Sequence, residues 1–390
     1  MELETRSART AGSGGWASVY AVGLSTFSVV TTEMLPVGLM TAIAMELETS
    51  VGTAGLMLSV PAILAALFAP FVILVAGSID RRRILAGLLV LLVAANIASA
   101  LAPSIGWLLA ARVVVGFCMG GIWAIAGGLA PRLVPTHSVG TATAIIFGGV
   151  AAASVLGVPV GAVIGDIAGW RSAFGAMALF SLFVLVLNLV ALPALPIRQS
   201  VGLGHFKGQL ARPAVQSGLI ITLLIVAGHF MAYTFVSPIL QSISGVRVEW
   251  IGVLLFLYGA AGIAGNFLAG MAVSRRLPAT LVSIAIGLVV AILGFRFLGT
   301  TAFAGAALLL VWGVAYGGVS VSLQSWMMKA APSALEIATA LFVAAFNIGI
   351  AAGSFAGGLV VDRFDLPTTL LLAALMPATA LLFFIVIPRR

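Results

Sequence analysis

Apolar residues along this 390-residue chain fall into twelve long runs that short polar segments separate. A helix needs about 20 apolar residues to cross roughly 30 Å of hydrocarbon, and each run approaches or exceeds that length. The runs predict membrane-spanning helices near Trp16–Ile43, Val51–Ala76, Ile84–Ala102, Trp107–Pro131, Val139–Gly165, Ala173–Leu195, Val215–Leu240, Trp250–Val273, Ala279–Gly299, Ala302–Met328, Leu335–Val361 and Pro367–Pro388.

Composition supports a lipid environment along the whole chain. Apolar residues make up 62% and charged residues 8% of the sequence, and the mean hydropathy is +1.23. A soluble domain carries about 25% charged residues. The runs are too long and too continuously apolar for the alternating strands of an outer-membrane barrel. The single cysteine, Cys118, lies in an apolar run and offers neither a disulfide nor a cysteine-based metal site.

Basic residues predict the orientation of the helices, because lysine and arginine gather on the cytoplasmic side of inner membranes. Fourteen of them fall on one side: Arg6, Arg9, Arg81, Arg82, Arg83, Arg132, Arg198, Lys207, Arg212, Arg275, Arg276, Lys329, Arg389 and Arg390. Four fall on the other side, namely Arg171, Arg247, Arg296 and Arg363. We therefore expect a multi-pass protein of a bacterial inner membrane with both termini in the cytoplasm. Its net charge of +8 sits in short loops, which favours lipid headgroups over nucleic acid as a partner.

A polar linker and an internal repeat divide the chain into halves. We predict a cytoplasmic tail at 1–15, a six-helix bundle at 16–195, a cytoplasmic linker at 196–214 and a second six-helix bundle at 215–390. Three ordered sets recur 193 to 197 residues on: Gly157, Gly161 and Asp166 as Gly353, Gly357 and Asp362; Gly116, Gly120, Gly121 and Pro135 as Gly313, Gly317, Gly318 and Pro332; Gly77, Arg82 and Arg83 as Gly270, Arg275 and Arg276. The fold expected is an all-α membrane protein of two pseudo-symmetric bundles with the same topology.

Two ionisable residues within the predicted spans are candidates for proton coupling. Glu33 lies in the first helix, about 15 Å from its outer end at 1.5 Å per residue. Arg112 lies in the outer part of the fourth helix. Charged groups inside a membrane segment cost about 2.5 to 3.5 kcal/mol on insertion scales, so each needs a reason to be there. Burial and a nearby guanidinium could together set proton uptake by Glu33 near working pH; a structural ion pair or a snorkelling arginine is the alternative.

Helical spacing gathers candidate cargo-binding residues. Met119 and Trp123 share a face of the fourth helix with Arg112, and His229 and Tyr233 share a face of the seventh. The further candidates are Phe27, Met34, Tyr316 and Asn347. Aromatic and methionine side chains would give an adaptable apolar surface, although such stripes also serve simple helix packing. A backbone hydrogen bond would explain His229 equally well, and Asn347 could instead bridge two helices.

Two segments are candidates for gating. The run from Gly157 through Pro159 and Gly161 to Gly165 spaces small residues so that two helices can approach closely, and its proline should bend the fifth helix. Asp80, Arg81 and Arg82 lie between the second and third helices, where charge contacts could lock one conformation. For this second segment, a role in setting topology alone is the alternative.

These residues resemble the major facilitator superfamily, in particular its twelve-helix drug:proton antiporters and the sugar and arabinose-efflux-like exporters. The first-helix signature of that branch is similar to Thr32-Glu33 followed by Pro36-Val37-Gly38-Leu39, and its fourth-helix motif is similar to Arg112 with Gly116. The fifth-helix antiporter motif is similar to Gly157–Gly165. The family's entry into the sixth helix is similar to Gly169-Trp170-Arg171 with Phe174. The resemblance implies alternating access, a proton-transfer role for the arginine and a monomer.

The predicted function is therefore secondary active transport, a proton-coupled antiport that exports small organic molecules such as drug-like compounds, sugars or related metabolites. The partners expected are the cargo, protons and lipid. A proton-coupled importer on the same fold is the nearest alternative. We find no phosphate-binding loop, zinc-binding histidine pair or nucleophile elbow in a plausible context, and the longest loop has about 19 residues. This argues against an enzyme, a sensor, a cofactor and ATP-driven transport.

Overall fold

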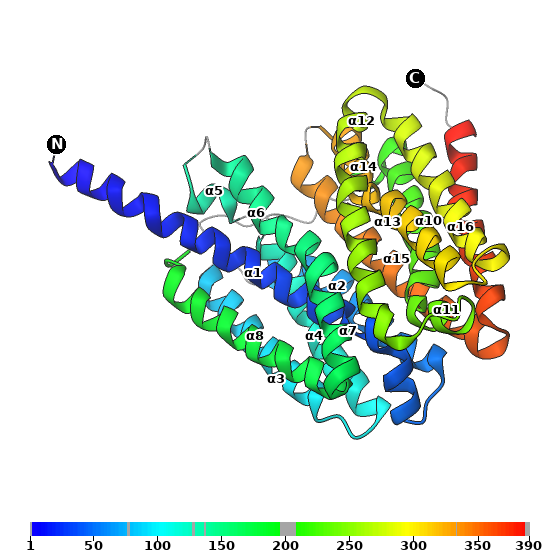
Figure 1. Cartoon of the computed structure of the whole chain (residues 1–390). Coiled ribbons are helices and arrows are strands. Elements are labelled where there is room, and N and C mark those ends of the chain that lie inside the picture. The colour runs from blue at the N-terminus through cyan, green and yellow to red at the C-terminus, as the bar shows by residue number, and fades with distance from the viewer. Residues whose placement is uncertain are drawn as a thin grey trace.

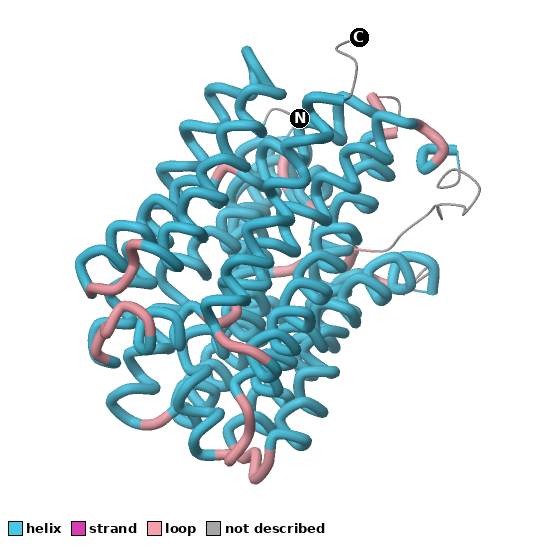
Figure 2. The backbone as a smooth tube through the Cα atoms, turned by 90° about the vertical axis from the view of Figure 1, so that its right-hand side faces the viewer, coloured by secondary structure: helices cyan, strands magenta, loops and turns pink. Residues whose placement is uncertain are grey.

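The computed structural model describes residues 2–75, 79–126, 129–135, 138–195, 208–332 and 334–386. Long helices joined by short loops make up these segments, and none of the segments contains a strand (Figure 2). Twelve helical stretches in the described chain are long and apolar enough to cross a membrane. The all-α fold with twelve transmembrane helices is thereby confirmed.

The N-terminal half begins with one long helix and continues with shorter ones. Its elements are α1 (Glu2–Glu46), α2 (Val51–Val75), α3 (Arg81–Ala100), α4 (Ile105–Ala126), α5 (Ala130–Leu133), α6 (Val139–Ala152), a π-helical turn (Ala153–Gly157), α7 (Val158–Ala168) and α8 (Trp170–Ala191). α6, the π-helical turn and α7 together form the fifth span. The first span begins at Gly15, whereas α1 itself extends back to Glu2.

The C-terminal half contains the other six spans. Its elements are α10 (Pro213–Tyr233), α11 (Val236–Ser242), α12 (Val248–Phe297), α13 (Ala302–Gly317), α14 (Val319–Ala330), α15 (Leu335–Arg363) and α16 (Leu366–Val386). α12 contains two spans, Val248–Val273 and Arg275–Phe297, and non-helical backbone angles at Arg276 kink it at the start of the second span. α13 and α14 form one span that is interrupted at the Gly317–Gly318 pair, a common cause of helix breaks.

The internal repeat appears in how the helices pack. Gly116 and Gly120 of α4 lie against Pro61 and Ala65 of α2, so closely that an added Cβ would collide there. Gly313 and Gly317 of α13 lie in the same way against Tyr258 and Gly262 of α12. The contacted residues, like the glycines, are 197 positions apart. The two bundles therefore share their packing as well as their order of helices.

The two bundles meet on one side of the molecule and spread apart on the other. In Figure 1, the ribbons of α1–α8 and α10–α16 diverge toward the side on which both chain termini lie. We call this the termini side. The opposite side, which we call the closed side, carries the short connections after α1, α3, α7, α11, α12 and α15.

Close backbone contacts and hydrogen bonds join the bundles on the closed side. A Cβ atom on either Gly52 of α2 or Gly358 of α15 would collide with the carbonyl oxygen of the other glycine. Asp362, near the end of α15, accepts hydrogen bonds from the Gly52 backbone N–H at 2.9 Å and from the Ser50 hydroxyl at 2.5 Å. Gln241 Nε2 donates to Thr41 Oγ1 at 3.1 Å. The Asp362 side chain of the C-terminal bundle thus caps the first turn of α2 in the N-terminal bundle.

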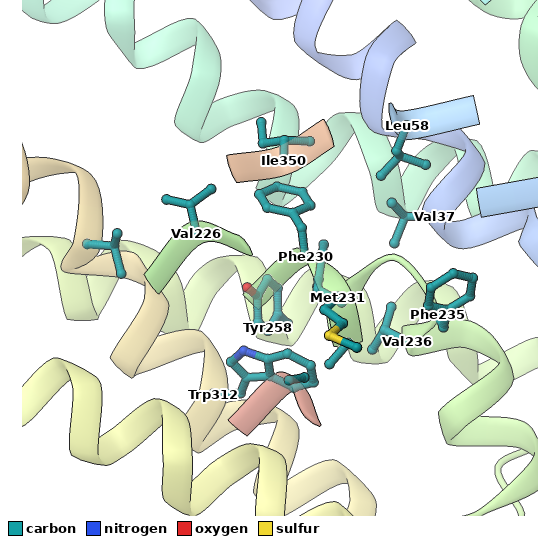
Figure 3. Close-up of a cluster of buried hydrophobic side chains, with 14 of the residues drawn as sticks. Val37, Leu58, Val226, Phe230, Met231, Phe235, Val236, Tyr258, Trp312 and Ile350 are labelled. Atoms are coloured by element: carbon teal, nitrogen blue, oxygen red, sulfur yellow. The ribbon is translucent and has the colours of Figure 1, made fainter. Parts of the chain in front are cut away.

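An apolar core continues across this junction (Figure 3). Val37 of α1 and Leu58 of α2 belong to the same buried cluster as Phe230 and Met231 of α10. A second cluster lies within the N-terminal bundle alone, between α1, α3, α4 and α8. The closed side is therefore held by apolar burial in addition to its hydrogen bonds.

Candidate functional site

Glu33 lies inside the first span and is almost completely buried, with 1% of its surface exposed. Neither carboxyl oxygen has a hydrogen-bond partner among the described residues. The neighbouring Thr32 is fixed, because its hydroxyl accepts a hydrogen bond from Asn96 of α3, whose amide also reaches Ser181 of α8. Glu33 is therefore an unpartnered acid on a rigid backbone segment.

Arg112 of α4 is fully buried next to the same segment. Its Nη1 donates to the Thr32 carbonyl oxygen at 2.6 Å, and its guanidinium carbon lies 4.7 Å from the centre of the Phe174 ring. The ion pairs within 4.0 Å in the described part of the chain are Arg171–Glu46 and Arg247–Glu249. Arg112 donates to the backbone of Thr32, next to Glu33, rather than to the Glu33 carboxyl group. The structure thus brings the two predicted residues together without a direct ion pair.

The candidate residues of the N-terminal bundle divide into packing residues and partly exposed residues. Phe27 packs edge-on against Phe180 of α8 at 5.2 Å between ring centres, and Met119 is 4% exposed within the core. Met34 and Trp123 are partly exposed. The indole N–H of Trp123 is buried without a hydrogen-bond partner. Of these four residues, Trp123 therefore has a polar atom left to offer a ligand.

Three aromatic candidates of the C-terminal bundle stack on one another. The His229 ring of α10 lies 3.4 Å from the Tyr316 ring of α13, with 9° between their planes, and 4.8 Å from the Tyr233 ring. Asn347 donates to the Val343 carbonyl of its own helix at 2.9 Å and bridges no helices through that bond, while its Oδ1 has no partner.

Two further aromatic residues join this group that the sequence pattern did not single out. Trp312 donates its indole N–H to His229 Nδ1 at 3.0 Å, and Tyr258 of α12 stacks on Tyr233 at 4.8 Å. Phe174, which supports the Arg112 guanidinium, entered the sequence analysis only through the family resemblance. Helical spacing orders residues within one helix, but it does not say which helices are neighbours, so these contacts required the fold.

The predicted gating loop makes its contacts within the N-terminal bundle. Asp80 caps α3 by accepting from the Arg82 backbone N–H at 2.8 Å, and it also accepts from the Leu195 N–H at 2.9 Å. The Arg81 N–H donates to the Leu195 carbonyl at 3.2 Å, and the Arg82 guanidinium donates to the Leu189 carbonyl. The loop therefore ties α3 to the end of α8. Gly77, at its start, lies outside the described residues.

The glycine stripe of the fifth span packs directly against α1. An added Cβ at Gly157 would collide with Thr31, and one at Gly161 would collide with Leu35. Pro159 follows the π-helical turn and lies close to Gly252 of α12, across the bundle junction. The helix therefore widens by a π-helical turn just before Pro159, and this span contacts both the Glu33 helix and the opposite bundle.

Comparison with known proteins agrees with this geometry. A bacterial homolog of the human lysosomal transporter Spinster, in an inward-facing and occupied conformation, aligns with a TM-score of 0.76 and 16% identity over 94% of this chain and 95% of that chain. The nucleoside transporter NupG aligns with a TM-score of 0.76 and 14% identity over 95% of this chain and 99% of that chain. These likenesses show the fold. The family model of the Major Facilitator Superfamily matches residues 22–336. The chain therefore belongs to the major facilitator superfamily, and it is a transporter of small molecules rather than an enzyme.

Proposed function

We propose that this transporter is a proton-coupled antiporter that exports small organic molecules, with Glu33 as the group that carries the proton. The observation that carries this proposal is the state of Glu33: a carboxyl group 1% exposed inside a membrane span, with neither oxygen hydrogen-bonded. An unpartnered buried polar group costs about 1 to 3 kcal/mol, and more when it is charged. Helix packing alone gives no reason to keep such a group.

The surroundings of Glu33 suit a carboxyl group that changes its protonation during transport. Burial disfavours the ionised form, while the positive charge of Arg112 favours it. Small changes in hydration or in the position of Arg112 can then decide whether the proton stays. Cargo that binds between the bundles next to the carboxylate would compete with the proton, which is the requirement for antiport.

The proposed cargo surface combines the eight predicted residues. It consists of Phe27, Met34, Met119 and Trp123 from the N-terminal bundle and His229, Tyr233, Tyr316 and Asn347 from the C-terminal bundle. Apolar rings supply most of the contact area, and the unpartnered atoms of Trp123, His229, Tyr316 and Asn347 supply hydrogen bonds. Drug-like compounds, sugars or related metabolites fit this description. NupG, a fold relative, is a nucleoside transporter.

We further propose that the protein is a monomer in a bacterial inner membrane, with the termini side toward the cytoplasm. The basic residues Arg81, Arg82, Arg83, Arg132, Arg212, Arg275, Arg276 and Lys329 lie near the helix ends of that side. In this orientation, the closed side faces outward, and the side on which the bundles diverge faces the cytoplasm. Export is supported by the resemblance of Gly157–Gly165 to the fifth-helix antiporter motif.

Proton release from purified protein in weakly buffered detergent tests the coupling. Antibiotics, sugars and nucleosides are added in turn to the wild type, to Glu33→Gln and to Glu48→Gln, which removes an exposed carboxyl group two residues after the end of α1. We expect one class of compound to release protons from the wild type and from Glu48→Gln but not from Glu33→Gln. Release that persists in Glu33→Gln contradicts the assignment of the proton to Glu33.

Accumulation of the same compound in cells tests the direction of transport. Expression of an exporter lowers the internal concentration of cargo, whereas an importer on the same fold raises it. Dissipating the proton gradient should abolish the difference between expressing and control cells. Accumulation that rises on expression would overturn export while leaving Glu33 as the coupling group.

A further inference from the structure

Four rings from three helices of the C-terminal bundle form a continuous stack, which we call the aromatic stack: Tyr316, His229, Tyr233 and Tyr258, in that order. The distances between successive ring centres are 3.4, 4.8 and 4.8 Å, and the angles between successive planes are 9°, 21° and 26°. Tyr316 is the partly exposed member, and it packs against the apolar cluster that spans both bundles. The aromatic stack therefore ends beside the cluster that joins the bundles.

Trp312 determines the tautomer of His229 within the aromatic stack. Its indole nitrogen, which can only donate, lies 3.0 Å from His229 Nδ1. Nδ1 must therefore be the nitrogen without a hydrogen. Because His229 is fully buried and its partner is a neutral donor, the ring is neutral and its hydrogen sits on Nε2. The sequence places these two residues 83 positions apart, on α10 and α13.

The hydrogen on Nε2 is left without an acceptor. Nε2 is buried and unpartnered, as are the hydroxyl groups of Tyr258 and Tyr316 in the aromatic stack. Of these three groups, the His229 Nε2–H can only donate, whereas each hydroxyl group can donate or accept. Phenylalanine would pack equally well at the tyrosine positions without leaving buried hydroxyl groups unpaired. The fixed donor of the aromatic stack is therefore the His229 Nε2–H.

We propose that Trp312 is a positioning residue that sets cargo specificity: it holds His229 as a fixed Nε2–H donor, so that the site takes cargo that presents an acceptor atom, such as a carbonyl oxygen or a ring nitrogen, to this hydrogen. This rests on the proposed antiport function and names its cargo class. A compound such as a quaternary phosphonium has no lone pair to accept this hydrogen bond. A buried donor disfavours compounds that leave it unpaired.

Binding of radiolabelled compounds to the purified full-length protein tests the cargo class. Caffeine and 1,3-dimethyluracil offer acceptors but no N–H donors, and tetraphenylphosphonium offers neither. We expect the wild type to bind at least one of the two acceptor compounds about tenfold or more tightly than the phosphonium. Failure of both acceptor compounds to bind, or tighter binding of the phosphonium, overturns the cargo class.

Trp312→Phe tests the positioning role, because it keeps an aromatic ring while removing the N–H. We expect the affinity for the acceptor compound to fall about tenfold or more, with the affinity for the phosphonium little changed. Trp170→Phe is the matched control: Trp170 is equally buried, at 1% exposure, but donates to Glu46 far from His229. The control should retain the wild-type preference, and equal losses in the two variants contradict a specific role for Trp312.

The tautomer itself can be observed by nitrogen NMR. The chain has three histidines, so His137→Gln with His205→Gln leaves His229 as the only labelled imidazole. We expect a neutral Nε2–H tautomer that Trp312→Phe shifts toward Nδ1–H, a change that a purely structural role would not produce. A wild-type Nδ1–H form, or a tautomer unchanged in Trp312→Phe, overturns the positioning role. Proton release that persists in Glu33→Gln would instead contradict the coupling proposal, and it would not affect the conclusion about the His229 tautomer.

Discussion

The guanidinium of Arg112 is held by geometry as well as by charge. It donates to the Thr32 carbonyl at 2.6 Å and stacks at 4.7 Å from the centre of the Phe174 ring, two contacts that use its planar shape. Lysine keeps the positive charge but has neither the fork nor the flat face. A role in charge alone would therefore tolerate lysine, and a role in position would not.

We expect Arg112→Lys to lower transport in proteoliposomes about tenfold or more while the protein still folds. The lost stacking and the lost charged hydrogen bond are together worth about 2 kcal/mol or more, most of which positions the charge beside Glu33. Arg171→Lys is the matched control, since Arg171 also stacks on an aromatic ring, Trp170, at 4.1 Å but at the closed side. Arg112→Lys with normal transport would show that its charge suffices.

At the level of elements, the sequence predicts most of what the fold contains. The twelve spans follow from the lengths of the apolar runs, and the repeat of Gly116 and Gly120 as Gly313 and Gly317 correctly marks corresponding helix contacts. The interruptions are harder to predict, because Gly317–Gly318 breaks a span while other glycine pairs, such as Gly148–Gly149, lie in continuous helix. Whether a glycine pair interrupts its helix depends on the neighbouring helix that packs against it, and a local sequence pattern does not identify that neighbour.

Because a local pattern does not identify neighbouring helices, the sequence predicts only some residues of the candidate site. Glu33 and Arg112 stand out because charge inside a membrane span is costly wherever it lies. Trp312 and Tyr258 do not stand out, because aromatic residues are common in apolar helices and their importance comes from contacts with α10. Asp362 entered only as a repeat of Asp166, yet Asp362 caps α2 across the bundle junction whereas Asp166 is exposed.

The contact of the fifth span with α1 gives an element-level prediction. We expect Gly157→Ala to lower the midpoint of thermal unfolding and to reduce transport, because its Cβ would collide with the Thr31 side chain two residues before Glu33. Overpacking of this kind costs about 1 to 3 kcal/mol. Gly148→Ala, in α6 of the same span, meets nothing within 4 Å and should leave both measurements near wild type. Equal effects of the two substitutions would contradict a packing role for the stripe.

At the scale of the whole molecule, contacts at the closed side stabilise the arrangement in which the two bundles meet there. Asp362→Asn should weaken it, because a neutral amide interacts less strongly than a carboxylate with the first turn of α2. We expect a larger population with the closed side open, seen as longer distances between spin labels at Glu48→Cys and Arg247→Cys in a Cys118→Ala background. Asp166→Asn, its exposed repeat partner, is the control. An unchanged distance distribution in Asp362→Asn would show that apolar burial alone holds the junction.

Alternating access requires the closed side to separate once in each cycle, and one pair of residues can block that step. Gln241 Nε2 and Thr41 Oγ1, from opposite bundles, lie 3.1 Å apart, so a short reducible bis-methanethiosulfonate should link cysteines placed at both positions. We expect Thr41→Cys with Gln241→Cys, in the Cys118→Ala background, to lose transport on treatment with this cross-linker and to regain it on reduction, while cargo still binds from the termini side. Each single cysteine should transport normally under both conditions. Continued transport by the fully cross-linked protein would mean that the bundles do not rock about this junction, and cargo would then need a path other than one between them.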